Sequence, residues 1–127
     1  MELITYLEQP VLRPLGKLGM SIPSLNRADV FLFILCDLFL SDQQTSQAIT
    51  YWYALHTSYL LMDDIHDYKN DIQNKEENSI FELGVGNLGF EKAFEVLLGN
   101  AKTLKKINPL LGSYFEESIA GLYNLIP

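Results

Sequence analysis

The residues best suited to chemistry lie together after an apolar, aromatic-rich segment. Asp63, Asp64 and Asp67 fall within five residues, and Asp71 follows four positions later. Like charges at i,i+4 on a helix repel by a few tenths of a kcal/mol, so this arrangement is tolerated cheaply only in open water or around a cation. Hard cations such as Mg²⁺ prefer carboxylate oxygens and then pair with substrate phosphates. The spacing therefore favours a Mg²⁺ site at Asp63, Asp64 and Asp67. The alternative is an inert, solvated helix end.

Other candidate sites have weaker support. Residues 84–89 match the dinucleotide fingerprint G-x-G-x-x-G, but that motif needs a preceding strand in a βαβ unit, so we interpret it as a turn between helices. His56 lies in a mostly apolar stretch, where a histidine is more often a hydrogen-bonded core residue than a ligand. No serine or cysteine has a base and an orienting carboxylate suggested by the sequence, so nucleophilic catalysis has no support.

The composition is that of one folded domain spanning residues 1–127. It is 48% hydrophobic and 12% aromatic, enough to form a core. A net charge of −7 argues against a nucleic-acid partner, which would require a basic surface.

Cys36 is the only cysteine, which favours a reducing cytoplasm. The N-terminus has no basic region typical of a signal peptide. The most apolar run, residues 30–40, contains Asp37 and is too short for a transmembrane segment.

The hydrophobic pattern predicts an all-α fold, because no segment shows sustained period-two alternation. Prolines at positions 10, 14 and 23 predict an irregular N-terminal wrap over residues 1–25, followed by a helical bundle over residues 26–127. We expect helices at 27–41 and 45–68, a mobile loop at 69–78, a helical turn at 79–83 and an amphipathic helix through residues 90–104. A last helix is expected to start at Asn108-Pro109, since proline is favoured at the first helical position.

The helix expected at 45–68 has Thr45 or Ser46 as its cap and an inward stripe at spacings of three and four. The stripe comprises Ile49, Trp52 or Tyr53, His56, Tyr59 or Leu60, Asp63 and Asp67. Asp64 lies about 100° further round the same turn.

The sequence of residues 55–67, LHTSYLLMDDIHD, resembles the first aspartate-rich motif, DDxxD, of the trans-isoprenyl diphosphate synthases (polyprenyl synthetase and terpenoid synthase-like proteins). The surrounding pattern H-T-x-x-L-x-x-D-D-I-x-D is shared as well. Residues 26–32 and 79–84 stand where that family has a G-G-K-x-x-R-P segment and an F-G turn. The resemblance covers roughly residues 24–98 and implies the N-terminal half of the isoprenoid synthase fold.

The resemblance also implies a chemistry. In the family, two aspartate-rich motifs across the mouth of an apolar cavity hold Mg²⁺ on the diphosphate of an allylic substrate. Carried over to this chain, the three aspartates would bind the metal, while Arg27 and Lys75 would contact the diphosphate. The cavity wall would include Trp52, His56 and Tyr59, the last at the position that limits product length.

The sequence departs from the family in three places. The arginine pair after the motif is replaced by residues 72–75, whose only cation is Lys75, and Pro23-Ser24-Leu25 replace the glycine-lysine part of the upstream segment. No second aspartate-rich motif is present; Glu116-Glu117 is the only later acidic pair. The first hypothesis is therefore a protein that binds Mg²⁺ and a prenyl diphosphate but is incomplete as a stand-alone prenyltransferase.

Such a protein would need a homodimer or hetero-oligomer to supply the opposing carboxylates, because half a bundle leaves apolar helix faces exposed. The second hypothesis is a non-catalytic helical binding or regulatory module derived from the same family. The sequence leaves open whether the chain is an enzyme. It also leaves open a third hypothesis, a metal site in an unrelated small helical bundle.

Overall fold

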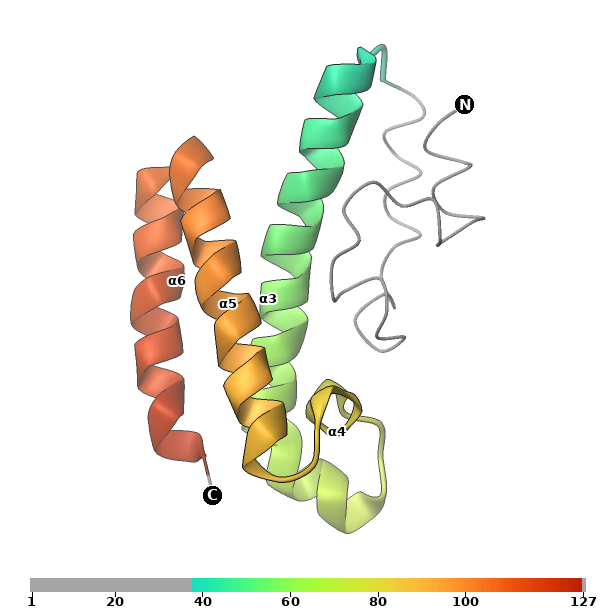
Figure 1. The fold of residues 1–127 in the computed structure, drawn as a ribbon, viewed down its shortest axis with the longest axis vertical. Helices are drawn as coiled ribbons and strands as arrows, with labels where there is room; N and C mark the ends of the chain where they lie inside the picture. Colours follow the sequence, from blue (N-terminus) through green and yellow to red (C-terminus); the bar gives the residue numbers. More distant parts are fainter. Residues whose placement is uncertain (1–37, 127) are drawn as a thin grey trace.

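The computed structural model describes residues 38–126, and this part of the chain is all-α, with four α-helices and no strand. In chain order they are α3 (Asp42–Asn74), α4 (Ser79–Leu83), α5 (Asn87–Ile107) and α6 (Pro109–Leu122), followed by a short 3₁₀ turn, η4 (Tyr123–Leu125). The helix α5 lies between α3 and α6, and the short α4 packs against α3 and α5 near the C-terminal end of α3 (Figure 1).

The longest element, α3, begins earlier than the sequence predicts. Its N-cap is Ser41, whose side chain accepts from the N–H of Gln44 at 3.1 Å, while the Gln44 side chain accepts from the N–H of Ser41 at 2.9 Å. This reciprocal capping box satisfies two backbone donors that a start at Thr45 or Ser46 would leave unpaired. The predicted caps were therefore wrong.

The helix α3 also ends later than predicted, at Asn74. Lys75 then adopts a left-handed conformation with φ of 56°, and its N–H bonds to the carbonyls of Asp71 and Ile72. The loop predicted over 69–78 is thus wrong for residues 69–74, because a polar sequence argues against an apolar face but does not exclude a helix. The helix predicted at 27–41 is wrong for residues 38–41, which are not helical; its remainder, and the N-terminal wrap over 1–25, lie outside the described residues.

Most predictions for the second half of the chain are confirmed; the turn predicted at 84–89 is wrong for residues 87–89, which form the first turn of α5. The turn at 79–83 is α4, the amphipathic stripe through 90–104 lies on α5, and Asn108 caps α6 with Pro109 at its first turn. At Gly112 the backbones of α5 and α6 come so close that an added Cβ would lie 2.5 Å from the Cβ of Lys105. Glycine is the residue that permits this approach.

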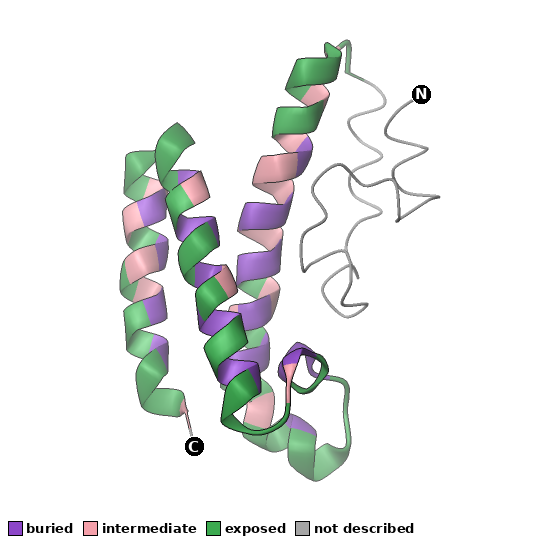
Figure 2. Ribbon diagram, in the orientation of Figure 1, coloured by how far each residue is buried: buried purple, intermediate pink, exposed green. Residues whose placement is uncertain are grey.

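The core is one contiguous cluster between α3, α5 and α6, closed at one end by α4 (Figure 2). Its members are Ala54, Leu61 and Ile65 from α3, Ile80 and Leu83 from α4, Phe90, Ala93, Phe94, Leu97, Ala101 and Leu104 from α5, and Phe115, Ile119 and Leu122 from α6. Between residues 38 and 126, no helix combines the length and apolarity needed to cross a membrane.

Candidate functional site: the aspartate-rich segment of α3

The buried face of α3 is rotated by about one residue from the predicted stripe. Ile49 and Tyr53 are buried as expected, but further along the inward positions are Ala54, Thr57, Ser58, Leu61, Asp64, Ile65 and Asp71. Asp63 and Asp67 are exposed instead. Ala54 lies in the core and Ser58 accepts a hydrogen bond from Asn100 of α5 at 3.2 Å, so this face of α3 packs against α5. The predicted inward position of Asp63 and Asp67 was therefore wrong.

Asp64 is buried, with 4% of its surface exposed. Its Oδ2 atom accepts a hydrogen bond from the backbone N–H of Ser79 at 2.9 Å and a second from the Ser79 hydroxyl. Ser79 is the first residue of α4 and is fully buried. One carboxylate oxygen thus satisfies both donors of a residue that water does not reach.

Asn78 completes the connection between the two helices. Its Nδ2 donates to the backbone carbonyl of Asp64 at 2.7 Å and to Oδ2 of Asp71 at 2.9 Å, and its Oδ1 accepts from the N–H of Ile80 at 3.0 Å. With 1% of its surface exposed, Asn78 has both amide hydrogens and its carbonyl oxygen bonded, as a buried amide requires.

We call Asp64, Asp71, Asn78 and Ser79 the anchor network. Its residues hold α4, a helix of five residues, against α3. A helix this short is unstable alone, because nucleation is costly and few backbone bonds follow it. The network therefore positions α4, and through it the start of α5.

The donor set does not fit a Mg²⁺ site that uses all three predicted aspartates. Asp64 points inward to Ser79, whereas Asp63 and Asp67 are exposed. In the described part of the chain, no group of three or more His, Cys, Asp or Glu side chains is placed to hold a metal ion. The segment is also not a helix end, since α3 continues to Asn74.

The other predicted site residues do not all come together. Trp52 and His56 are half-buried and their rings stack with centroids 4.8 Å apart. Tyr59 is 47% exposed and contacts Phe115 of α6 edge-on at 5.3 Å, so it lies at the contact between α3 and α6. Lys75 is exposed at the end of α3, and Arg27 lies outside the described residues.

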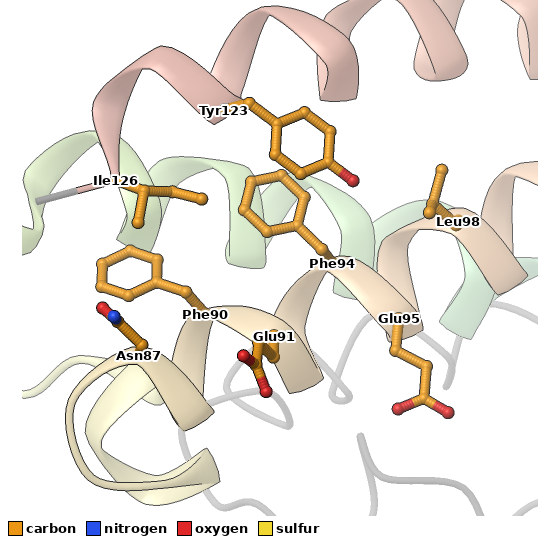
Figure 3. A pocket seen from close by; sticks show the side chains of 8 residues that line it. All are labelled: Asn87, Phe90, Glu91, Phe94, Glu95, Leu98, Tyr123 and Ile126. Atoms are coloured by element: carbon orange, nitrogen blue, oxygen red, sulfur yellow. The ribbon is translucent and has the colours of Figure 1, made fainter.

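A groove that the sequence did not reveal lies between the first half of α5 and the C-terminal end of the described chain (Figure 3). It has a volume of about 550 Å³ and is lined by Asn87, Phe90, Glu91, Phe94, Glu95, Leu98, Tyr123 and Ile126. The rings of Phe94 and Tyr123 stack with their centroids 4.2 Å apart. Phe90 and Phe94 were predictable from the stripe of α5, whereas Tyr123 and Ile126 join them only because α6 folds back antiparallel to α5.

The groove has an apolar floor and an acidic edge. Glu91 and Glu95 leave α5 on the side away from the aromatic rings (Figure 3), and both are exposed. Their charges make the groove unfavourable for a diphosphate and compatible with an uncharged or cationic apolar ligand.

Comparison with known proteins finds no matching family model, no matching curated protein and no matching solved structure.

Proposed function

We propose that this chain is a non-catalytic helical binding module whose sequence resembles the N-terminal half of the isoprenoid synthase fold. One observation carries the proposal: the Asp64 carboxylate is bonded to the N–H and hydroxyl of Ser79. The central acid of the DDxxD-like motif thus serves to join two helices. A motif used in this way retains the helical scaffold without the metal chemistry that the resemblance implies.

The charges elsewhere agree with this proposal. A diphosphate is held tightly by bidentate, charge-assisted hydrogen bonds, most often from arginine, and the sequence lacks the arginine pair of the family. Lys69, two residues after Asp67, lies exposed on α3, and Lys75, the predicted diphosphate contact, terminates that helix. We assign ligand binding instead to the groove lined by Phe90, Phe94 and Tyr123, whose volume of about 550 Å³ lies within the range of small-molecule sites.

The second candidate function is binding of Mg²⁺ and an allylic diphosphate, completed by a second chain in a homodimer or hetero-oligomer. It is favoured by Asp63 and Asp67, which are both exposed and lie four residues apart on one face of α3. Two carboxylates are a usual protein contribution to a Mg²⁺ ion that also binds substrate phosphates.

Isothermal titration calorimetry distinguishes the two functions. The full chain is titrated with inorganic pyrophosphate and with an allylic diphosphate, each in the presence of Mg²⁺, alongside the double variant Asp63→Asn/Asp67→Asn. Asp42→Asn, an exposed acid in the first turn of the same helix, serves as the control. We expect no binding heat in any of the three proteins. Mg²⁺-dependent binding that is lost in the double variant and kept in the control would establish the second function and overturn the first.

A further inference from the structure

The outer face of α5 carries an ordered pattern of charge. Seven residues opposite its buried face form what we call the outer stripe: Leu88, Glu91, Glu95, Leu98, Gly99, Lys102 and Lys106. All seven are exposed, and at 100° per residue they fall within an arc of about 100° on the helix surface. The stripe thus runs along almost the whole of α5, between α3 and α6 (Figure 2).

The charges of the stripe change sign at its midpoint. Glu91 and Glu95 precede Leu98 and Gly99, and Lys102 and Lys106 follow them. None of these four charged side chains makes an ion pair within residues 38–126. In that part of the chain, the salt bridge made by α5 joins Lys105 to Glu116 of α6. The helix dipole favours acids early and bases late, but it does not require them to share one narrow stripe at mirrored positions.

From this pattern we infer that α5 packs antiparallel against α5 of a second copy of the chain. The two-fold axis lies between Leu98 and Gly99. In that register Glu95 faces the partner's Lys102, and Glu91 faces the partner's Lys106. Because a two-fold contact is isologous, each pair occurs twice, and both ends of the stripe are neutralised together.

Gly99 supports the inference independently of charge. A Cβ added there meets nothing within 4 Å, so the fold of one copy does not need glycine at this position. Yet glycine in a helix interior costs about 1 kcal/mol relative to alanine. At the crossing point of two helices it allows the backbones to approach closely. Leu98, which is 41% exposed, supplies an apolar contact beside it.

A second copy fits this surface better than an unrelated partner. If the partner were a different protein, the charges of this stripe could stand in any order, because the partner's surface would complement them. Self-association instead requires opposite charges at positions equidistant from the midpoint of the stripe, and this is the observed order. The same register brings Lys92 near the partner's Lys105, and the charge of Lys105 is balanced by Glu116 at 3.2 Å. A contact through one helix from each copy falls among small interfaces, below about 1,200 Å², so we expect a dimer of micromolar or weaker affinity.

Sedimentation equilibrium over a concentration series up to about 1 mM tests the dimer with charge-reversal variants of the full chain. Glu95→Lys and Lys102→Glu each place like charges opposite one another twice, and each is expected to weaken the dimer roughly 10- to 30-fold. The double variant Glu95→Lys/Lys102→Glu recreates both pairs with reversed polarity and should regain wild-type association. Glu117→Lys, the same charge change at an exposed site on α6, should have no effect.

A mixing experiment gives a stricter test. A chain with Glu91→Lys/Glu95→Lys has four lysines on the stripe, and a chain with Lys102→Glu/Lys106→Glu has four glutamates. Each alone should be monomeric, and an equimolar mixture should form a heterodimer. A wild-type chain that stays monomeric throughout the series would overturn the inference. So would a failure of the double variant to regain association, or an equimolar mixture that stays monomeric.

Discussion

Replacement of Asp64 by alanine should destabilise the fold far more than the same change at Asp63, its neighbour in the sequence. Asp64→Ala removes two hydrogen bonds to the carboxylate and leaves the N–H and hydroxyl of Ser79 without their acceptor. Ser79 is fully buried, and a charge-assisted hydrogen bond contributes about 1.5–3 kcal/mol. Allowing for water that enters the space left by the carboxylate, we expect a loss of about 3–4 kcal/mol.

Asp63→Ala is the matched control, because Asp63 is exposed and an exposed substitution of this kind changes stability by about 0.5 kcal/mol or less. Urea unfolding followed by far-ultraviolet circular dichroism measures the free energy of unfolding of both variants. With a slope near 2 kcal/mol per M, typical of a chain of this size, the Asp64 variant should unfold at a midpoint lower by about 1.5–2 M, while the midpoint of the Asp63 variant should shift by about 0.25 M or less. A difference between the two below about 1 kcal/mol would refute the anchor role of Asp64.

A double-mutant cycle isolates the contact itself. Ser79→Ala removes the hydroxyl donor but keeps the backbone N–H, so it should cost less than Asp64→Ala. The two changes together should cost less than their sum by at least about 1 kcal/mol, because both remove the same hydrogen bond. Additive costs would mean that the Asp64–Ser79 bond contributes nothing to stability.

Two further predictions concern the packing of α6 and the groove. Gly112→Ala places a Cβ 2.5 Å from the Cβ of Lys105 and should cost about 2–3 kcal/mol in urea unfolding, whereas Gly121→Ala meets nothing within 4 Å and should stabilise by up to about 1 kcal/mol. Ile126→Glu should abolish the fluorescence of the neutral dye Nile red in the groove, and Leu110→Glu, at an apolar position 84% exposed on α6, should leave it unchanged. Equal losses in the two charged variants would place the dye elsewhere.

The elements after Asn78 could be predicted from sequence because their ends are marked by local chemistry. Asn108 accepts from the N–H of Leu111 at 3.0 Å, and Pro109 fixes the first turn of α6. Between these signals the apolar stripe of α5 has helical spacing and becomes the centre of the core. Local capping residues and one clear period are enough to place such helices within about three residues.

The end of α3 and the rotation of its face could not be predicted in the same way. Asp71 is buried by a contact with Asn78 at 2.9 Å, and that contact forms only after the chain reverses at Lys75. The rotation depends on the fit of α3 to α5, where the Nδ2 of Asn100 donates to the Ser58 hydroxyl at 3.2 Å. These are tertiary interactions between residues up to 42 positions apart, and no local pattern on α3 encodes them.

The acidic segment illustrates why a short motif does not determine the use of its residues. Consecutive positions on a helix point about 100° apart, so Asp63 and Asp64 cannot both face the same neighbour closely. In this chain the inward acids are Asp64 and Asp71, separated by two helical turns, and Asn78 follows after seven more positions. The pattern that describes the anchor is therefore D-x₆-D-x₆-N-S.

This pattern leaves Asp63 and Asp67 out, so it separates two roles that the DDxxD string combines. If the anchor is what the fold requires, Asp63 and Asp67 can be exchanged together for asparagine or glutamine without loss of stability. Asp64, Asp71, Asn78 and Ser79 should each resist exchange, because each is at least nine-tenths buried and bonded to another member of the anchor network. A set of single substitutions scored by folding alone would show this division. Equal sensitivity at Asp63 and Asp64 would mean that the acidic segment acts as one unit.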